Sequence, residues 1–158
     1  MYNKSIPHST QGDLKGKKMI GDFLCNQNFK VFFFTKKEET MDGYFVDGEG
    51  NYHLFDVKFN CQDLSKYRTL LCCSSSKLKA FQKYNIDHWY MVMVDCDNIY
   101  IKSVPKKFYE NPIYNVKYWW LKDTEELGKP LKWGWYEKLS IPRKEFKQFK
   151  INQLKQKI

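Results

Sequence analysis

The sequence has no uncharged apolar run of about 18 residues, the length that a membrane-spanning helix needs. Its first residues, 1–5, also lack the apolar stretch of a signal peptide. We therefore expect an intracellular protein with no part in the membrane, located in the cytoplasm or associated with nucleic acid.

The cysteines lack the paired spacing of a zinc site. There are five of them, with no CxxC pair, and the three histidines do not complete a ligand pattern. We interpret them as free, mostly buried thiols in a reducing compartment, in preference to a metal or redox centre. They are Cys25, Cys61, Cys72, Cys73 and Cys96.

Acidic residues are scarce: 18 Asp and Glu stand against 27 Lys and Arg, which gives a net charge of +9. Such an excess favours a polyanionic partner, either nucleic acid or an anionic membrane surface. Residues 137–158 hold seven basic residues and two acids. A solvated helix face would explain this basic tail equally well.

What is present in quantity is aromatic residues, at 18% of a chain of 158 residues. This length and composition predict one domain with a substantial core. No repeat or low-complexity linker divides the chain, so we expect a single domain over 1–158, with a core at about 11–104 and an aromatic and basic extension at about 105–158.

Periodicity predicts an α/β fold in which helices flank a mixed central β-sheet. We expect a first helix at 14–26, a mostly helical segment at 64–84 and a terminal basic helix at 143–157 with Phe146 and Phe149 facing inward. The expected strands are 29–35, a hairpin within 42–59, 89–94, 99–104 and, in the aromatic region, 114–121.

The hairpin within 42–59 carries the most informative side chains. Asp42 opens its first run, and the second run alternates so that Asp56 and Lys58 share a face. Two carboxylates and an ammonium group at a sheet edge can hold a divalent metal ion beside a water and a phosphate. Alternatively, Asp42 is an ordinary turn residue and the other two form a pair on a solvated strand.

These residues resemble the PD-(D/E)xK nuclease superfamily, which includes Holliday-junction resolvases, restriction enzymes and homing endonucleases of group I introns. The segments that carry the resemblance are Gln11-Gly12-Asp13-Leu14, Met41-Asp42-Gly43 and Asp56-Val57-Lys58. The resemblance implies a restriction-endonuclease-like core of helix, three strands, helix and strand. Asp13 would replace the glutamate that many members carry in the first helix, whereas Asp22 is at least as well explained as a surface acid.

The resemblance implies hydrolysis of DNA with Mg²⁺, or Mn²⁺ in its place. Asp42, Asp56 and the carbonyl of Val57 would bind the metal, and Lys58 would position the attacking water or stabilise the developing charge. Lys77, on the element after the third strand, would approach the phosphate. Basic residues of the extension would grip the DNA backbone; they are Arg143, Lys144 and Lys147.

Three hypotheses remain open at this stage. The first is a metal-dependent endonuclease acting on duplex or branched DNA, as a homodimer or higher homo-oligomer if both strands are cut. The second is a catalytically inactive nuclease fold that binds nucleic acid or serves in assembly. The third is a basic domain that docks on a protein complex. Aromatic residues of 114–135 would stack on unpaired bases or form core and interface. Richness in lysine, asparagine and tyrosine suggests a phage or mobile element.

Overall fold

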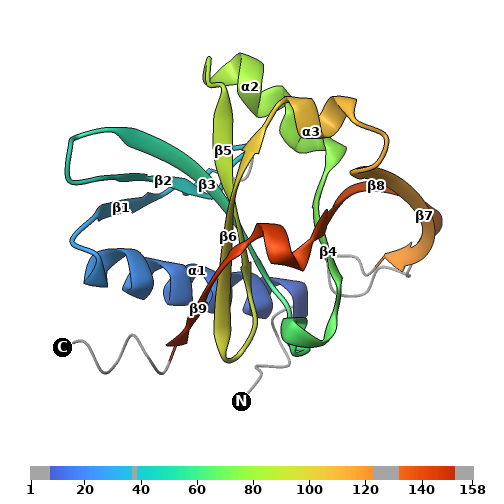
Figure 1. Cartoon of the computed structure of the whole chain (residues 1–158), viewed down its shortest axis with the longest axis horizontal. Coiled ribbons are helices and arrows are strands. Elements are labelled where there is room, and N and C mark those ends of the chain that lie inside the picture. The colour runs from blue at the N-terminus through green and yellow to red at the C-terminus, as the bar shows by residue number, and fades with distance from the viewer. Residues whose placement is uncertain (1–7, 37–38, 123–131, 152–158) are drawn as a thin grey trace.

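The computed structural model describes residues 8–36, 39–122 and 132–151. Within these ranges, a six-stranded and a three-stranded sheet pack together, and one long helix lies against the larger sheet (Figure 1). The fold is therefore mixed α/β with a mixed central sheet, as the periodicity predicted.

The helical elements comprise three α-helices and three short 3-10 helices within the described ranges. They are α1 (His8–Asn26), α2 (Lys79–Lys83), α3 (Lys107–Glu110), η1 (Leu64–Lys66), η2 (Ser75–Leu78) and η3 (Arg143–Glu145). The strands are β1 (Lys30–Phe33), β2 (Gly43–Val46), β3 (Tyr52–Phe59), β4 (Thr69–Ser74), β5 (His88–Val94), β6 (Asn98–Pro105), β7 (Asn115–Lys122), β8 (Lys132–Pro142) and β9 (Lys147–Lys150).

The larger sheet has the order β1-β2-β3-β5-β6-β9, and the smaller has the order β4-β8-β7. Only the β3–β5 pair is parallel among the described strands; every other pair is antiparallel. A parallel pair needs a crossover, which here runs through η1, β4, η2 and α2. The crossover thus places β4 and η2 beside the end of β3.

Helix α1 covers one face of the larger sheet. Its apolar side chains Ile20 and Phe23 are buried against Phe55 and Val57 of β3. Gly16 is buried at the crossing, where a Cβ atom would lie 3.2 Å from the Cβ of Phe59. A glycine here lets the helix approach β3 closely.

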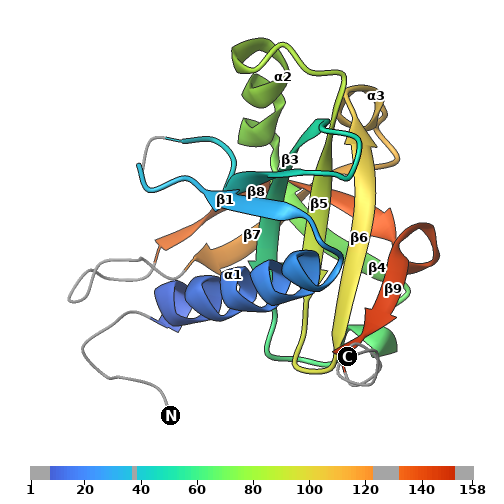
Figure 2. The ribbon, with the colours of Figure 1, turned by 90° about the vertical axis from the view of Figure 1, so that its left-hand side faces the viewer.

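The opposite face of the larger sheet packs against the smaller sheet and α2 (Figure 2). The cluster between them includes Met91 and Met93 of β5 together with Leu139 and Ile141 of β8. All four side chains are at most 1% exposed. The molecule therefore has three layers, with the larger sheet in the middle.

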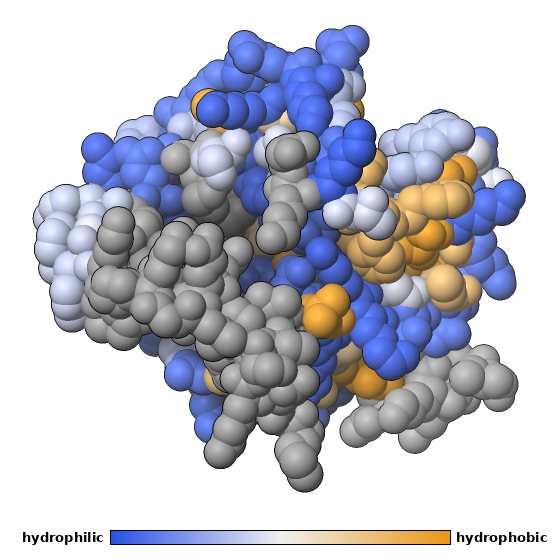
Figure 3. Space-filling view, turned by 180° about the vertical axis from the view of Figure 1, so that it is seen from behind, coloured by the Kyte–Doolittle hydropathy of each residue, from blue (hydrophilic) through white to orange (hydrophobic). Residues whose placement is uncertain are grey.

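Exposed residues on the back of the molecule are mainly hydrophilic, and apolar residues gather at the right-hand edge in Figure 3. Strand β1, at the edge of the larger sheet, exposes Phe32 and Phe33. The predicted strand at 29–35 is thus confirmed as β1, an edge strand of the larger sheet.

One helix prediction is wrong and another is confirmed only in part: the described residues of 143–157 form no such helix, and the segment 64–84 is helical at 64–66 and 75–83 but not between them. The segment 64–84 contains strand β4 between short helical turns, because β4 pairs with β8 about 70 residues further along the chain. The segment from residue 143 forms η3 and then β9, in which Phe149 pairs with Ile99 of β6. An inward-facing Phe146 and Phe149 suited either structure; residues 152–157 of the predicted helix lie outside the described ranges.

The other predicted elements are confirmed within a few residues. The hairpin, both strands at 89–94 and 99–104, and the strand at 114–121 are present, and the first helix begins earlier, at His8. The sequence did not predict β8. Among the cysteines that the structure describes, Cys72 is buried but Cys25, Cys61 and Cys96 are free and exposed, so the expectation of mostly buried thiols is wrong.

Candidate active site

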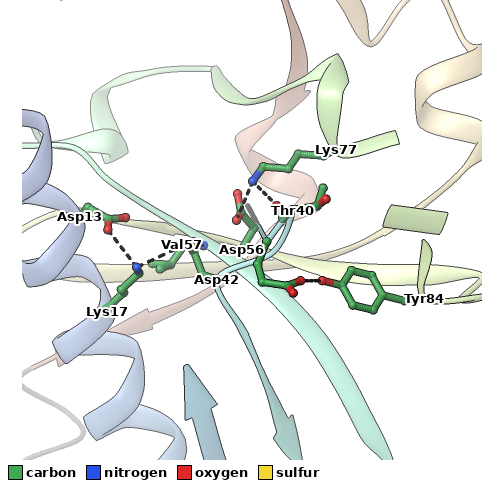
Figure 4. Close-up of polar contacts among 9 residues, drawn as sticks. Asp13, Lys17, Thr40, Asp42, Asp56, Val57, Lys77 and Tyr84 are labelled. Atoms are coloured by element: carbon green, nitrogen blue, oxygen red, sulfur yellow. Dashed lines mark hydrogen bonds and ion pairs between the residues drawn. The ribbon is translucent and has the colours of Figure 1, made fainter. Parts of the chain in front are cut away.

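Asp42 and Asp56 face each other where strands β2 and β3 separate. The antiparallel register pairs Gly43 with Phe55, so that one further step along each strand reaches the two aspartates. Oδ2 of Asp42 accepts a hydrogen bond of 2.8 Å from the backbone N–H of Val57 (Figure 4). The carboxylate thus takes the place of a backbone carbonyl and is held against β3.

Gly43 has no side chain, and this allows the neighbouring Asp42 to lie close to β3. A Cβ atom at Gly43 would lie 2.2 Å from the carbonyl oxygen of Phe32 and 3.1 Å from the ring of Phe55. Only glycine permits β1, β2 and β3 to come so close at this point. The Asp-Gly pair, which is typical of a turn in isolation, is here a strand start that carries a carboxylate.

Asp56 is a buried acid with a strongly perturbed pKa. Its side chain projects from β3 on the face that packs against the smaller sheet, and the residue is 7% exposed. Burial, and secondly the charge of Asp42, raise its pKa to about 8, although Lys77 acts in the opposite direction. The proximity of the Asp42 and Asp56 carboxylates therefore favours binding of a cation or a proton at this site.

Lys77 supplies positive charge to Asp56 from the crossover. Its Nζ atom lies 3.1 Å from Oδ1 of Asp56 and also donates a hydrogen bond to the backbone carbonyl of Thr40. Figure 4 shows the ammonium group between these two acceptors. The sequence placed Lys77 near the site, and the structure brings it into direct contact with an acid.

Helix α1 brings a second lysine to the carboxylates. Nζ of Lys17 lies 3.0 Å from Asp13 and 3.7 Å from Oδ1 of Asp42. Burial lowers the pKa of Lys17, but the two aspartates outweigh it and raise the pKa above its ordinary value. The site therefore includes Asp13, as predicted, but through an ion pair with Lys17, a residue that the sequence reasoning did not assign. Asp22 pairs instead with Lys18 on the surface.

Lys58 lies on the same face as Asp56 and reaches a neighbouring cavity. It is partly buried and lines a hollow of about 530 Å³ together with Asn60, Gln62 and Tyr67. In the part of the chain that the structure describes, its ammonium group has no hydrogen-bond or ion-pair partner. Lys58 is thus available to a ligand beside Asp56.

Unlike Lys77, the basic residues of the extension that were predicted to bind DNA have no described contact with this site. Nε of Arg143 donates a hydrogen bond of 2.8 Å to the carbonyl of Tyr67, and the ammonium of Lys147 lies 5.4 Å from the ring centroid of Phe149. Strand β9 is three positions from β3 in the sheet, or about 14 Å. Together with the exposed Lys144, these residues lie outside the carboxylate site.

Among the described residues, no three side chains of His, Cys, Asp or Glu come together as a metal site. Mg²⁺ nevertheless binds commonly through one or two carboxylates, with phosphate oxygens and water completing its shell.

Within the described ranges, no helix has the length and apolar character needed to cross a membrane.

Comparisons of the chain with protein-family models, with curated proteins and with solved structures give no match.

Proposed function

We propose that the protein is a Mg²⁺-dependent endonuclease that hydrolyses phosphodiester bonds in DNA, with a core of the PD-(D/E)xK type. The observation that carries the proposal is the pair Asp42 and Asp56, which face each other where β2 leaves β3. Both acids come from the positions that the motif predicts, and one is a buried carboxylate whose pKa is raised to about 8. Perturbed acids of this kind are concentrated at functional sites.

The residues present fit a divalent ion. Asp42, Asp56 and the Val57 carbonyl would hold it, and hard oxygen donors are the ligands that Mg²⁺ prefers. When bound, the ion would polarise the phosphate and lower the pKa of a coordinated water. The ammonium of Lys77 lies 3.1 Å from Asp56, so a metal ion bound there would release this ammonium group toward the phosphate. Lys58, which has no hydrogen-bond or ion-pair partner within the described residues, would orient the water or the phosphate.

The order of elements also supports the proposal. A helix, three antiparallel strands and a crossover lead to β5, which is parallel to β3. A restriction-endonuclease-like core would have this order, with β4 and η2 as an insertion in the crossover. The smaller sheet and β9 then form the extension beyond this core.

A second candidate is a catalytically inactive module that uses the same fold to bind nucleic acid or assemble with it. The specific observation in its favour is that both acids already have lysine partners: Lys17 approaches Asp42, and Lys77 approaches Asp56. In this case the lysines would stabilise the fold permanently. Either candidate places the protein with DNA, inside the cell, and is compatible with a phage or mobile-element origin.

Cleavage assays separate the two candidates. Wild-type protein is incubated with supercoiled plasmid, single-stranded DNA and branched DNA in Mg²⁺ or Mn²⁺. We expect nicking that is lost in Asp56→Asn and reduced at least about 100-fold in Lys58→Met. Asp22→Asn, which alters a surface acid paired with Lys18, serves as the matched control and should cleave normally.

Absence of cleavage on all three substrates, with DNA binding that weakens steeply with salt, would favour the inactive module. Cleavage of both strands at one place would require a homodimer or higher homo-oligomer, because each chain has one such site. Sedimentation of the protein with and without DNA tests this. Measuring the salt dependence of DNA binding by Lys144→Ala and Lys147→Ala tests the predicted contacts of the basic extension.

A further inference from the structure

Three tryptophans form an exposed cluster on the hairpin of β7 and β8. Trp119, Trp133 and Trp135 are 52%, 60% and 68% exposed. Trp119 lies opposite Trp135 in the strand register, and their rings meet edge to face with centroids 5.5 Å apart. The Trp133 ring is nearly parallel to that of Trp119 at 6.3 Å. Large aromatic side chains gathered in this way, exposed to solvent, mark a binding surface.

The cluster lies on the inner face of the smaller sheet. Side chains alternate along β8, so Trp133 and Trp135 are on the same face as Leu139 and Ile141. The latter two are buried against the larger sheet, whereas the tryptophans stand beyond its cover. Figure 2 shows β7 and β8 extending past the larger sheet, on the side where α1 begins.

Asp56 and Lys58, the two motif residues of β3, lie on the face of the larger sheet that packs against the smaller sheet. Asp56 pairs in register with Met91, and Lys58 pairs with Met93. Both methionines belong to the cluster that packs against Leu139 of β8. The tryptophans and the acidic site therefore lie on the facing sides of the two sheets, with the tryptophans where the smaller sheet extends beyond the larger one.

A direct contact links the two features. The 3-10 helix η2 carries Lys77, whose ammonium group binds Asp56, and η2 also contacts β8. In register, Ser74 at the end of β4 pairs with Lys138, three residues beyond Trp135. A chain bound at the carboxylates would lie next to η2, which itself contacts the strand that carries Trp133 and Trp135.

Charge indicates the nature of that chain. Strands β7 and β8 together contain four lysines and one glutamate, in a protein of net charge +9. Lys117 pairs with the glutamate, Glu137, at 3.2 Å. Strand alternation places Lys117 on the same face as the tryptophans and Lys138 on the opposite face. The excess of positive charge over the whole protein suits a nucleic-acid strand, whose bases can stack on exposed rings. A duplex keeps its bases stacked inside, so the rings require unpaired bases.

We propose that Trp119, Trp133 and Trp135 are a stacking platform for unpaired bases of the strand whose backbone enters the Asp42–Asp56 site. The inference rests on the proposed function for the identity of the site, and it adds the substrate class. Preferred substrates would be single strands, flaps or junctions with unpaired nucleotides next to the scissile phosphate.

Binding in EDTA tests the platform separately from cleavage. The probe is a fluorescein-labelled oligothymidylate of about 16 nucleotides, at the upper end of ordinary site sizes, compared with a blunt duplex of equal length. We expect Trp119→Ala and Trp135→Ala each to bind the oligothymidylate at least about fivefold more weakly, with little change for the duplex. Trp135→Phe, which keeps a ring, should retain most of the affinity.

Tyr52→Ala is the matched control, because this tyrosine is 74% exposed but lies on β3 in the other sheet. The affinity of Tyr52→Ala for the oligothymidylate should equal that of wild type. Equal binding of the oligothymidylate by wild type and the tryptophan variants would overturn the platform. So would a change from dimer to monomer in these variants with unchanged DNA affinity, since the tryptophans would then form a contact between copies.

The two proposals fail in distinguishable ways. Wild-type protein that binds oligothymidylate through the tryptophans but cleaves nothing would refute the endonuclease and keep the platform. Protein that cleaves DNA while the tryptophan variants bind and cleave single strands as wild type does would refute the platform alone. Thermal unfolding of each variant confirms that truncation of an exposed ring leaves the fold intact.

Discussion

The ammonium of Lys77 lies 3.1 Å from the carboxylate of Asp56, a residue 21 positions earlier in the chain. The two come from β3 and from the crossover that makes β5 parallel to it. Burial and Asp42 raise the pKa of Asp56, and Lys77 offsets part of this rise, leaving the pKa at about 8. The ammonium of Lys77 therefore compensates part of the free-energy cost of a negative charge on the buried Asp56.

Replacing Asp56 with asparagine should change how stability depends on pH. The pKa of Asp56 is about 8 in the folded state, against an ordinary value of 3.8. The folded protein retains a proton that the unfolded chain loses, so this group makes the free energy of unfolding fall as pH rises from about 4 to 8. Asp56→Asn removes that dependence. At pH 8.5 the free energy of unfolding of the variant should exceed that of wild type by about 1–3 kcal/mol.

Urea unfolding at several pH values measures this difference. Because other groups also titrate, the useful quantity is the difference between variant and wild type at each pH. Asp22→Asn, at an exposed ion pair, is the control and should follow wild type throughout. A difference that stays constant over the whole range would contradict the raised pKa.

Metal binding should release a proton near neutral pH. Asp56 is largely protonated at pH 7 because its pKa is about 8, and a carboxylate must lose its proton to bind Mg²⁺. Calorimetric titration in buffers of different ionisation enthalpy should report release of close to one proton at about pH 7 and little at about pH 9.5. Binding without proton release at the lower pH would place the metal elsewhere.

Gly43→Ala should destabilise the protein strongly. The new Cβ atom would meet the carbonyl oxygen of Phe32 at 2.2 Å, so that β1 must move away from β2. We expect the free energy of unfolding to fall by at least about 2 kcal/mol. Gly48→Ala is the matched control, since a Cβ atom there has no neighbour within 4 Å, and its effect should stay within about 0.5 kcal/mol. Equal melting temperatures of the two variants would contradict the close approach.

Asp95 should be structural rather than catalytic. It is 1% exposed and accepts backbone hydrogen bonds from Leu64 at 2.9 Å and Asn98 at 2.7 Å. Asp95→Ala leaves these buried donors unsatisfied and should cost about 3 kcal/mol. Cleavage per folded molecule should remain normal. Asp97→Ala, at an exposed neighbour, tests whether the turn itself is sensitive; a similar loss there would contradict the role of Asp95.

Much of the core was predictable from local pattern. Alternation in 52–59 gave β3 and the shared face of Asp56 and Lys58, and the apolar run at 89–94 gave β5. These predictions succeeded because burial of one face imposes a period on the sequence. The segment around β4 was misread as helix because its pairing with β8 is decided by residues far along the chain.

The sequence by itself determined which acids stand on neighbouring strands, because Asp42 and Asp56 are placed by hairpin register and strand alternation. Only the tertiary structure decided what surrounds them. Lys17 and Lys77 reach the acids through helix packing and a crossover, and no local period encodes such contacts. The same holds for the exposed tryptophans, because the packing of one sheet on the other decides which part of β7 and β8 is left uncovered.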